Sequence, residues 1–160
     1  MDEFYNTGIK EKKNKMLKIT GIIAAVTGII AAFFGFYIMM INMQSFDKGM
    51  DKEALLVYKK MYLLGIYIIA LGVVFCIFGF YGVVNSGVYD NCRNVVKYAV
   101  IMCVLSLVDI ILVALFGNIN AVSMGLVMVP MVISILFLIG AKSNYKNVND
   151  LYDKKVTEGE

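Results

Sequence analysis

The fold of this protein is decided by two stretches of equal length, GIIAAVTGIIAAFFGFY at residues 21–37 and GIYIIALGVVFCIFGFY at residues 65–81. Seven of their 17 aligned positions are identical, and each stretch has three glycines at a spacing of seven. Glycines at that spacing advance by about 700°, two turns less about 20°, and so form one stripe on a helix. The residues expected to pack two helices together in this way are Gly21, Gly28, Gly35, Gly65, Gly72 and Gly79. A large residue at Gly28 or Gly72 is expected to separate them.

Each stretch lies inside a longer run that contains no charged residue, at residues 19–46 and 61–89. A third such run covers residues 110–141. Each run is longer than the roughly 20 residues that cross a bilayer. The whole chain of 160 residues has only 17% charged residues and a mean hydropathy of +0.76. These values exclude a secreted disulfide scaffold, a nucleic-acid-binding module and an ordinary soluble enzyme, and they favour a polytopic membrane protein.

The apolar runs divide the chain into an all-α, antiparallel bundle of four transmembrane helices. The expected spans are about 17–41, 61–84, 95–116 and 121–140, in a membrane domain over residues 17–140. An outer loop at 42–60 and a short polar turn at 117–120 join consecutive spans, while residues 1–16 and 141–160 form tails. The first run is too long for a signal peptide and is interpreted as an uncleaved helix.

Basic residues predict the orientation of the bundle. Eleven Lys and Arg residues lie in the two tails and in the stretch 85–97, against four in the other two loops. Positive residues are retained in the cytoplasm. We therefore expect a multi-pass protein of the cytoplasmic membrane with both termini inside. All but one of the basic residues are Lys, a composition typical of a bacterial genome poor in G and C.

Two polar segments flank the spans. Asp51 is a candidate helix cap that would start the second helix well before residue 61. Beyond Gly140, apolar residues recur at helical spacing at Tyr145, Val148 and Leu151. This C-terminal segment is either a solvated tail or an amphipathic helix that lies on the membrane or docks a partner.

Asp109 is the one acidic residue well inside a span, and an acid at such a place is a candidate functional group. Ser106 shares its helical face and is expected to donate a hydrogen bond to it. Pro130 leaves the carbonyl oxygen of Leu126 without its helical donor, and a protonated Asp109 would satisfy that oxygen. The three residues Asp109, Ser106 and Pro130 are therefore interpreted either as a structural clip between the third and fourth helices or as a proton or cation relay.

The repeat also has two interpretations. Because the first two helices would run in opposite directions, the motif is inserted twice with opposite orientation, as in the inverted repeats of transporters that open to two sides. A self-complementary glycine stripe is, however, also an efficient way to pack an antiparallel pair in lipid, where no hydrophobic force joins helices. We favour the packing interpretation.

Catalytic chemistry has few residues to draw on. The chain has no histidine and only three cysteines, which removes the commonest general base and predicts no structural metal site. Phosphate-binding loops and paired intramembrane acids are absent from the sequence. We expect no enzymatic activity, no cofactor, no metal and no nucleic-acid partner.

The segment from Lys97 to Cys103, followed by Ser106 to Ile110, resembles the late helix of some toxin-secretion holins over a small part of the chain. The resemblance implies a pore-forming membrane protein. Our leading hypothesis is instead a small non-enzymatic membrane protein that packs with itself or serves as an accessory subunit of a membrane complex. A small transporter or channel that uses Asp109, including a holin-like pore, is the alternative.

Overall fold

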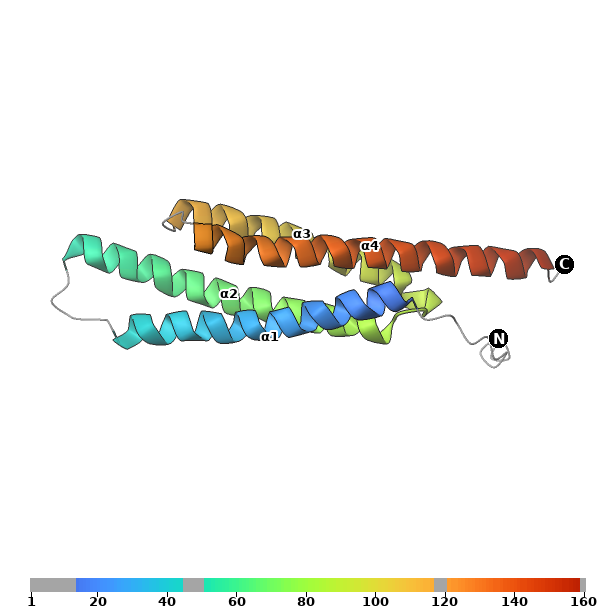
Figure 1. The fold of residues 1–160 in the computed structure, drawn as a ribbon, viewed down its shortest axis with the longest axis horizontal. Coiled ribbons are helices and arrows are strands. Elements are labelled where there is room, and N and C mark those ends of the chain that lie inside the picture. The colour runs from blue at the N-terminus through green and yellow to red at the C-terminus, as the bar shows by residue number, and fades with distance from the viewer. Residues whose placement is uncertain (1–13, 45–50, 117–120, 159–160) are drawn as a thin grey trace.

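The computed structural model describes residues 14–44, 51–116 and 121–158, and these form four long α-helices (Figure 1). The helices are α1 (Lys15–Gln44), α2 (Lys52–Val84), α3 (Tyr89–Phe116) and α4 (Ala121–Glu158). Each contains a segment long and apolar enough to cross a membrane, as the charge-free runs predict. The polar turn predicted at 117–120 and residues 45–50 of the predicted outer loop lie outside the described residues.

The helix ends gather at two opposite ends of the molecule (Figure 1). At the first, here called the tail end, α1 begins, α4 ends and residues 85–88 join α2 to α3. At the second, here called the loop end, α1 and α3 end and α2 and α4 begin. Helix α4 projects past the other three helices at the tail end (Figure 1).

Two of the helices begin at polar caps. The Asp51 carboxylate accepts a hydrogen bond from the backbone N–H of Ala54 at 2.7 Å, which confirms the predicted cap and starts α2 at Lys52. The side-chain oxygen of Asn14 likewise accepts from the N–H of Leu17 at 3.1 Å. Such caps satisfy donors that a helix leaves unpaired in its first turn. The helices therefore extend beyond the apolar runs that identified them.

Helices α1 and α2 meet through the six predicted glycines, all of which are buried. The contacts pair the glycines in reverse order, as two helices of opposite direction require. The pairs are Gly21 with Gly79, Gly28 with Gly72, and Gly35 with Gly65. A Cβ atom on Gly72 would lie 2.5 Å from the carbonyl oxygen of Gly28 and 2.6 Å from the backbone nitrogen of Ala32. Because these obstacles are backbone atoms, no side-chain rotation relieves the overlap.

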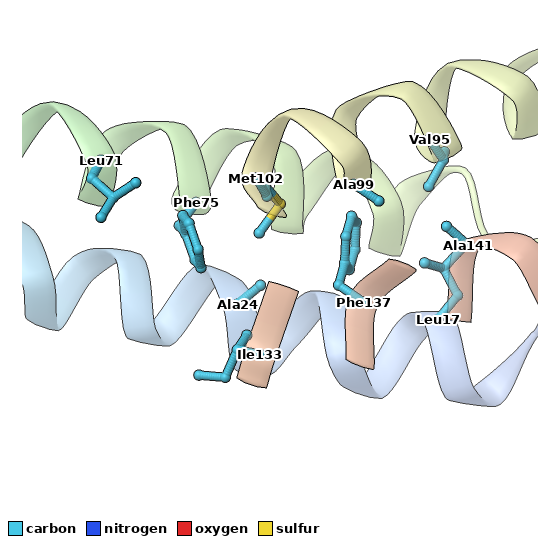
Figure 2. Close-up of a cluster of buried hydrophobic side chains, with 10 residues drawn as sticks. All are labelled: Leu17, Ala24, Leu71, Phe75, Val95, Ala99, Met102, Ile133, Phe137 and Ala141. Carbon is cyan, nitrogen blue, oxygen red and sulfur yellow. The ribbon is translucent and has the colours of Figure 1, made fainter. Parts of the chain in front are cut away.

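The hydrophobic core lies between the α1–α2 pair and the α3–α4 pair. Figure 2 shows ten buried side chains from all four helices along this contact. Phe137 of α4 is fully buried, and its ring occupies the space that a Cβ on Gly82 of α2 would enter, 2.5 Å away. Gly140, where the fourth span was predicted to end, packs against Leu17 and Thr20 of α1 while α4 continues past it. Glycines outside the repeat thus bring α4 close to both helices of the first pair.

Aromatic rings make a further contact between α2 and α3. The ring of Tyr98 stacks on Phe78 with centroids 4.5 Å apart and meets Tyr81 edge-on at 5.0 Å. Offset-stacked and edge-to-face arrangements are the favourable geometries for aromatic pairs. This contact fixes α3 beside α2 near the tail end, about two turns of α3 before Ser106.

Candidate functional site

Asp109 lies on α3 and is 95% buried, since only 5% of its surface is exposed. Its Oδ1 atom has no hydrogen-bond partner among the described residues. A buried polar atom without a partner costs free energy, so most proteins avoid one. Asp109, which the sequence singled out as a candidate functional group, is therefore buried with one carboxyl oxygen unpartnered, which is rare for an acidic side chain.

Ser106 does not donate to Asp109 as its position predicted. Its hydroxyl donates to the carbonyl oxygen of Met102, one turn earlier in α3, at 2.9 Å. It also lies 2.9 Å from the hydroxyl of Ser134 on α4. A short serine side chain readily reaches the carbonyl four residues back in its own helix, and this local partner replaces the predicted one.

The two serines share too few protons for their contacts. Ser134 lies 2.8 Å from the carbonyl oxygen of Pro130, so the two hydroxyls make three contacts with two protons. One serine must therefore donate to the other instead of to its own helix, or share its proton between two acceptors. Both side chains are fully buried, and this polar link joins α3 to α4.

Pro130 is accommodated inside α4, which continues without interruption on both sides of it. Its role in the structure is to present its own carbonyl oxygen to Ser134. Leu126, whose carbonyl was predicted to accept from Asp109, belongs to the part of α4 at 121–127 whose side-chain surroundings are not described. That hydrogen bond therefore stays a prediction.

Like Ser134, Tyr67 of α2 is a member of the site that was not predicted from the sequence. Its hydroxyl donates to the carbonyl oxygen of Leu105 at 2.7 Å. Leu105 precedes Asp109 by four residues, so in a regular helix its carbonyl also receives the backbone N–H of Asp109. The position of Tyr67 in an apolar run could have predicted its role, because a phenol hydroxyl in an apolar environment needs a hydrogen-bond acceptor.

These residues form one group, within the candidate membrane spans, to which three helices contribute. We call it the polar cluster: Tyr67 of α2, Ser106 and Asp109 of α3, and Pro130 and Ser134 of α4. It lies on the loop-end side of the hydrophobic core residues of α3, Val95, Ala99 and Met102. The arrangement can hold a proton or a small hard cation through oxygen atoms, and it contains no nucleophile paired with a base.

The remaining polar groups and hollows offer less chemistry. At the tail end, Asn91 donates to Asn85 at 2.6 Å and Asn85 donates to the carbonyl oxygen of Tyr81 at 2.8 Å, which fixes the turn between α2 and α3. A groove of about 520 Å³ on the α1–α2 pair is lined by apolar side chains such as Phe33 and Val73, apart from Cys76. Within residues 14–44, 51–116 and 121–158 no group of three His, Cys, Asp or Glu side chains could bind a metal ion.

Comparison of the chain with protein families, with curated proteins and with solved structures finds no match.

Proposed function

We propose that this chain is a small, non-enzymatic integral membrane protein that acts through helix packing, either with itself or as an accessory subunit of a membrane complex. The observation that carries the proposal is the exposure of large apolar side chains on all four helices. Ile30 and Phe33 of α1 are 63% and 71% exposed, and Leu115 of α3 is 68% exposed. Water-soluble proteins rarely expose contiguous apolar surface on this scale, whereas lipid covers it at no cost.

In this proposal the four helices cross the cytoplasmic membrane as an antiparallel bundle, with the tail end in the cytoplasm. Exposed basic residues at the tail end support that orientation: Lys15, Lys18, Arg93, Lys97, Lys142 and Lys146. Among the described residues, the loop end carries fewer basic side chains: Lys52, Lys59 and Lys60. The positive-inside rule places the more basic end in the cytoplasm.

The overhanging part of α4 supports an accessory role. Ala141 and Asn144 are still buried against the bundle, and the helix continues for 14 more residues to Glu158, about 21 Å at 1.5 Å per residue, past the ends of the other helices (Figure 1). Tyr145 on this segment is 40% exposed. Leu151, which the sequence analysis placed on the same side, lies outside the residues whose side chains are described. We propose this overhang as the attachment point for a partner.

Extraction into native-lipid nanodiscs tests the proposal. The full chain should be recovered as an oligomer or with a partner, whereas a chain that lacks residues 142–160 should lose the partner while its helix content per residue stays unchanged. A full chain with Lys146→Gln is the matched control, because it keeps the overhang and changes only one exposed charge. Recovery of a lone monomer, with the truncation leaving every cellular phenotype unchanged, would contradict the proposal.

A small transporter or channel, including a pore former, is the second candidate function. The observation that favours it is the buried Asp109 oxygen without a partner in a candidate span. Membrane transport proteins use such acids to carry protons or ions. The repeat adds a second, weaker argument, because inverted repeats support access from two sides.

Dye-reported proton and cation flux in proteoliposomes separates the two candidates. The transporter hypothesis requires a flux in the wild type that Asp109→Asn reduces, with orientation checked by protease access to the C-terminal segment. Equal flux in both proteins would remove Asp109 from the pathway. Absence of flux from a folded wild type would leave the packing function as the better account.

A further inference from the structure

The polar cluster has more acceptors than protons. The Tyr67 hydroxyl donates its proton to the Leu105 carbonyl oxygen, and the two serine protons are divided among three contacts. Within the described residues no donor is left for Oδ1 of Asp109. A carboxylate is an acceptor only, and it needs several donors when it is buried.

Charged partners for Asp109 are also missing from the surrounding helices. Residues 110–141 contain no ionisable side chain, so the part of α4 that packs on α3 in the membrane contributes none. Helix α2 contributes Tyr67, whose hydroxyl reaches the turn before Asp109, and the nearest ionisable side chain on α3 is Cys103, almost two turns earlier. A carboxylate charge would therefore be buried without a counterion, which costs about 3 kcal/mol on insertion scales even at a single helix.

We propose that Asp109 and Tyr67 together form a proton-binding site that exists in two hydrogen-bonding states. In the first, Tyr67 donates to Leu105, as observed, and the Asp109 carboxyl carries a proton. In the second, the O–H bond of the Asp109 carboxyl breaks and its proton passes to a water molecule that reaches the site from the loop end, where α3 ends about 10 Å away. The Tyr67 hydroxyl then turns from the Leu105 oxygen to the Asp109 carboxylate and keeps its own proton.

The geometry makes this exchange a short movement. Tyr67 donates to the Leu105 carbonyl oxygen, one turn before Asp109, and helical side chains lean toward the N-terminus of their helix, so the Asp109 carboxyl lies over the same turn. Rotation of the tyrosine C–O bond and a small side-chain shift redirect the proton without unwinding the helix. The α2–α3 hydrogen bond is exchanged at the same moment, so proton release changes a contact between helices.

The inference deepens the second candidate function, because it rests on the same membrane placement of α3, but it does not require flux. A site can take up and release a proton in a protein that moves no ions across the membrane. A failed flux experiment and a failed titration are therefore different results.

Infrared spectroscopy of the full chain in liposomes tests the site directly. A protonated carboxylic acid has a carbonyl stretch that is separate from the amide bands, and subtraction of the Asp109→Asn spectrum isolates the contribution of Asp109. We expect this band in the wild type at neutral pH and its loss as the pH rises. Identical wild-type and Asp109→Asn spectra in folded protein would overturn the proposal.

The role of Tyr67 is tested by the pH at which the band is lost. Tyr67→Phe removes the donor that stabilises the carboxylate, so the midpoint should move upward by about one to two pH units, the equivalent of a hydrogen bond to a charged group. Tyr37→Phe, an exposed tyrosine on α1, is the matched control and should leave the midpoint unchanged. An unchanged midpoint in Tyr67→Phe would show that Asp109 binds its proton without Tyr67 and would overturn the two-residue site.

The identity of the ion is tested with salts. Replacement of choline chloride by sodium or potassium chloride at constant pH should leave the band unchanged if the site takes a proton alone. Loss of the band in either metal salt would assign Asp109 to a metal cation instead and would overturn the proposal.

Discussion

The α1–α2 pair and the α3–α4 pair are both built from two consecutive apolar helices, but they are held together in different ways. In the first pair, glycines bring backbone atoms into direct contact along most of the apolar length. In the second, a hydroxyl pair in the polar cluster links the helices, and next to it lies a carboxyl group with an unpartnered oxygen.

This difference indicates that the residues that hold the helices together and the residues that can carry out chemistry lie mostly in different helix pairs. Lipid supplies no hydrophobic force between helices, so dispersion and weak hydrogen bonds at close range must hold them. The glycine pair maximises this contribution and leaves no room for polar side chains. The second pair retains polar groups that cost stability, and it is positioned by its contacts with the first. Four experiments with substituted proteins test this division.

Gly72→Leu should have the largest effect. The new side chain would enter space that backbone atoms of Gly28 and Ala32 occupy, so the first pair must separate. We expect a loss of more than about 3 kcal/mol in the free energy of unfolding, measured by circular dichroism in mixed micelles. Ala70→Leu, at an exposed position of the same helix, is the matched control and should have little effect. Equal stability of the two variants would show that the helices do not meet at Gly72.

Phe137→Ala tests the contact between the two pairs. The ring is fully buried and faces Gly82, so its removal leaves a cavity that neither backbone can fill. A loss of about 3 kcal/mol is expected in the same unfolding measurement. Leu136→Ala, one residue earlier and exposed, should cost far less. If the two variants lose the same stability, the pairs do not depend on this core for their association.

Asp109→Leu should stabilise the protein. Replacement of a buried group with an unpartnered oxygen by an apolar side chain of similar size removes a desolvation cost, and we expect a gain of about 1–2 kcal/mol. Asp109→Asn keeps a polar group in place and should gain less. A loss of stability in the leucine variant would mean that Asp109 is a structural clip, as the alternative interpretation of the sequence holds.

Ser106→Ala and Ser134→Ala should show the smallest effect, as a coupling between two positions. A double-mutant cycle should give an interaction energy of about 0.6 kcal/mol, the average for hydrogen bonds between membrane helices. Ser106→Ala combined with Thr20→Val provides the control, because Thr20 lies on α1 and bonds to the carbonyls of Met16 and Leu17. These two changes should be additive, and coupling of equal size in both cycles would remove the serine link.

The features that lipid imposes on the chain were predictable from sequence. Charge is excluded from a bilayer, so the charge-poor apolar segments identified the four helices, and a carboxylate at a helix start identified the Asp51 cap. The period of seven in the glycines carried enough information to predict their shared interface. The true helix ends were less visible, because the polarity that marks the edge of a membrane does not stop a helix, as α4 shows beyond Gly140.

The partners inside the polar cluster were not predictable in the same way. Hydropathy does not fix the rotation of a helix about its axis, and rotation decides that Tyr67 faces Leu105 and that Ser134 faces Ser106. Ser106 was assigned to Asp109 because the two share a face, but a local carbonyl competes for a short side chain. Gly82 was missed because it lies outside the seven-residue glycine spacing and because its partner, Phe137, is far from it in the sequence.

The equal spacing of the glycines has a consequence for how the chain finds its register. If α1 slipped along α2 by one glycine interval, Gly21 would face Gly72 and Gly28 would face Gly65, so two of the three pairs would survive. The repeat alone therefore does not fix the register of α1 against α2. The contacts of Gly140 with Leu17 and of Gly82 with Phe137 tie both helices to α4, and a slip of about 10 Å would break at least one of them. The first pair is therefore fixed in its final alignment only when α4 has packed against it.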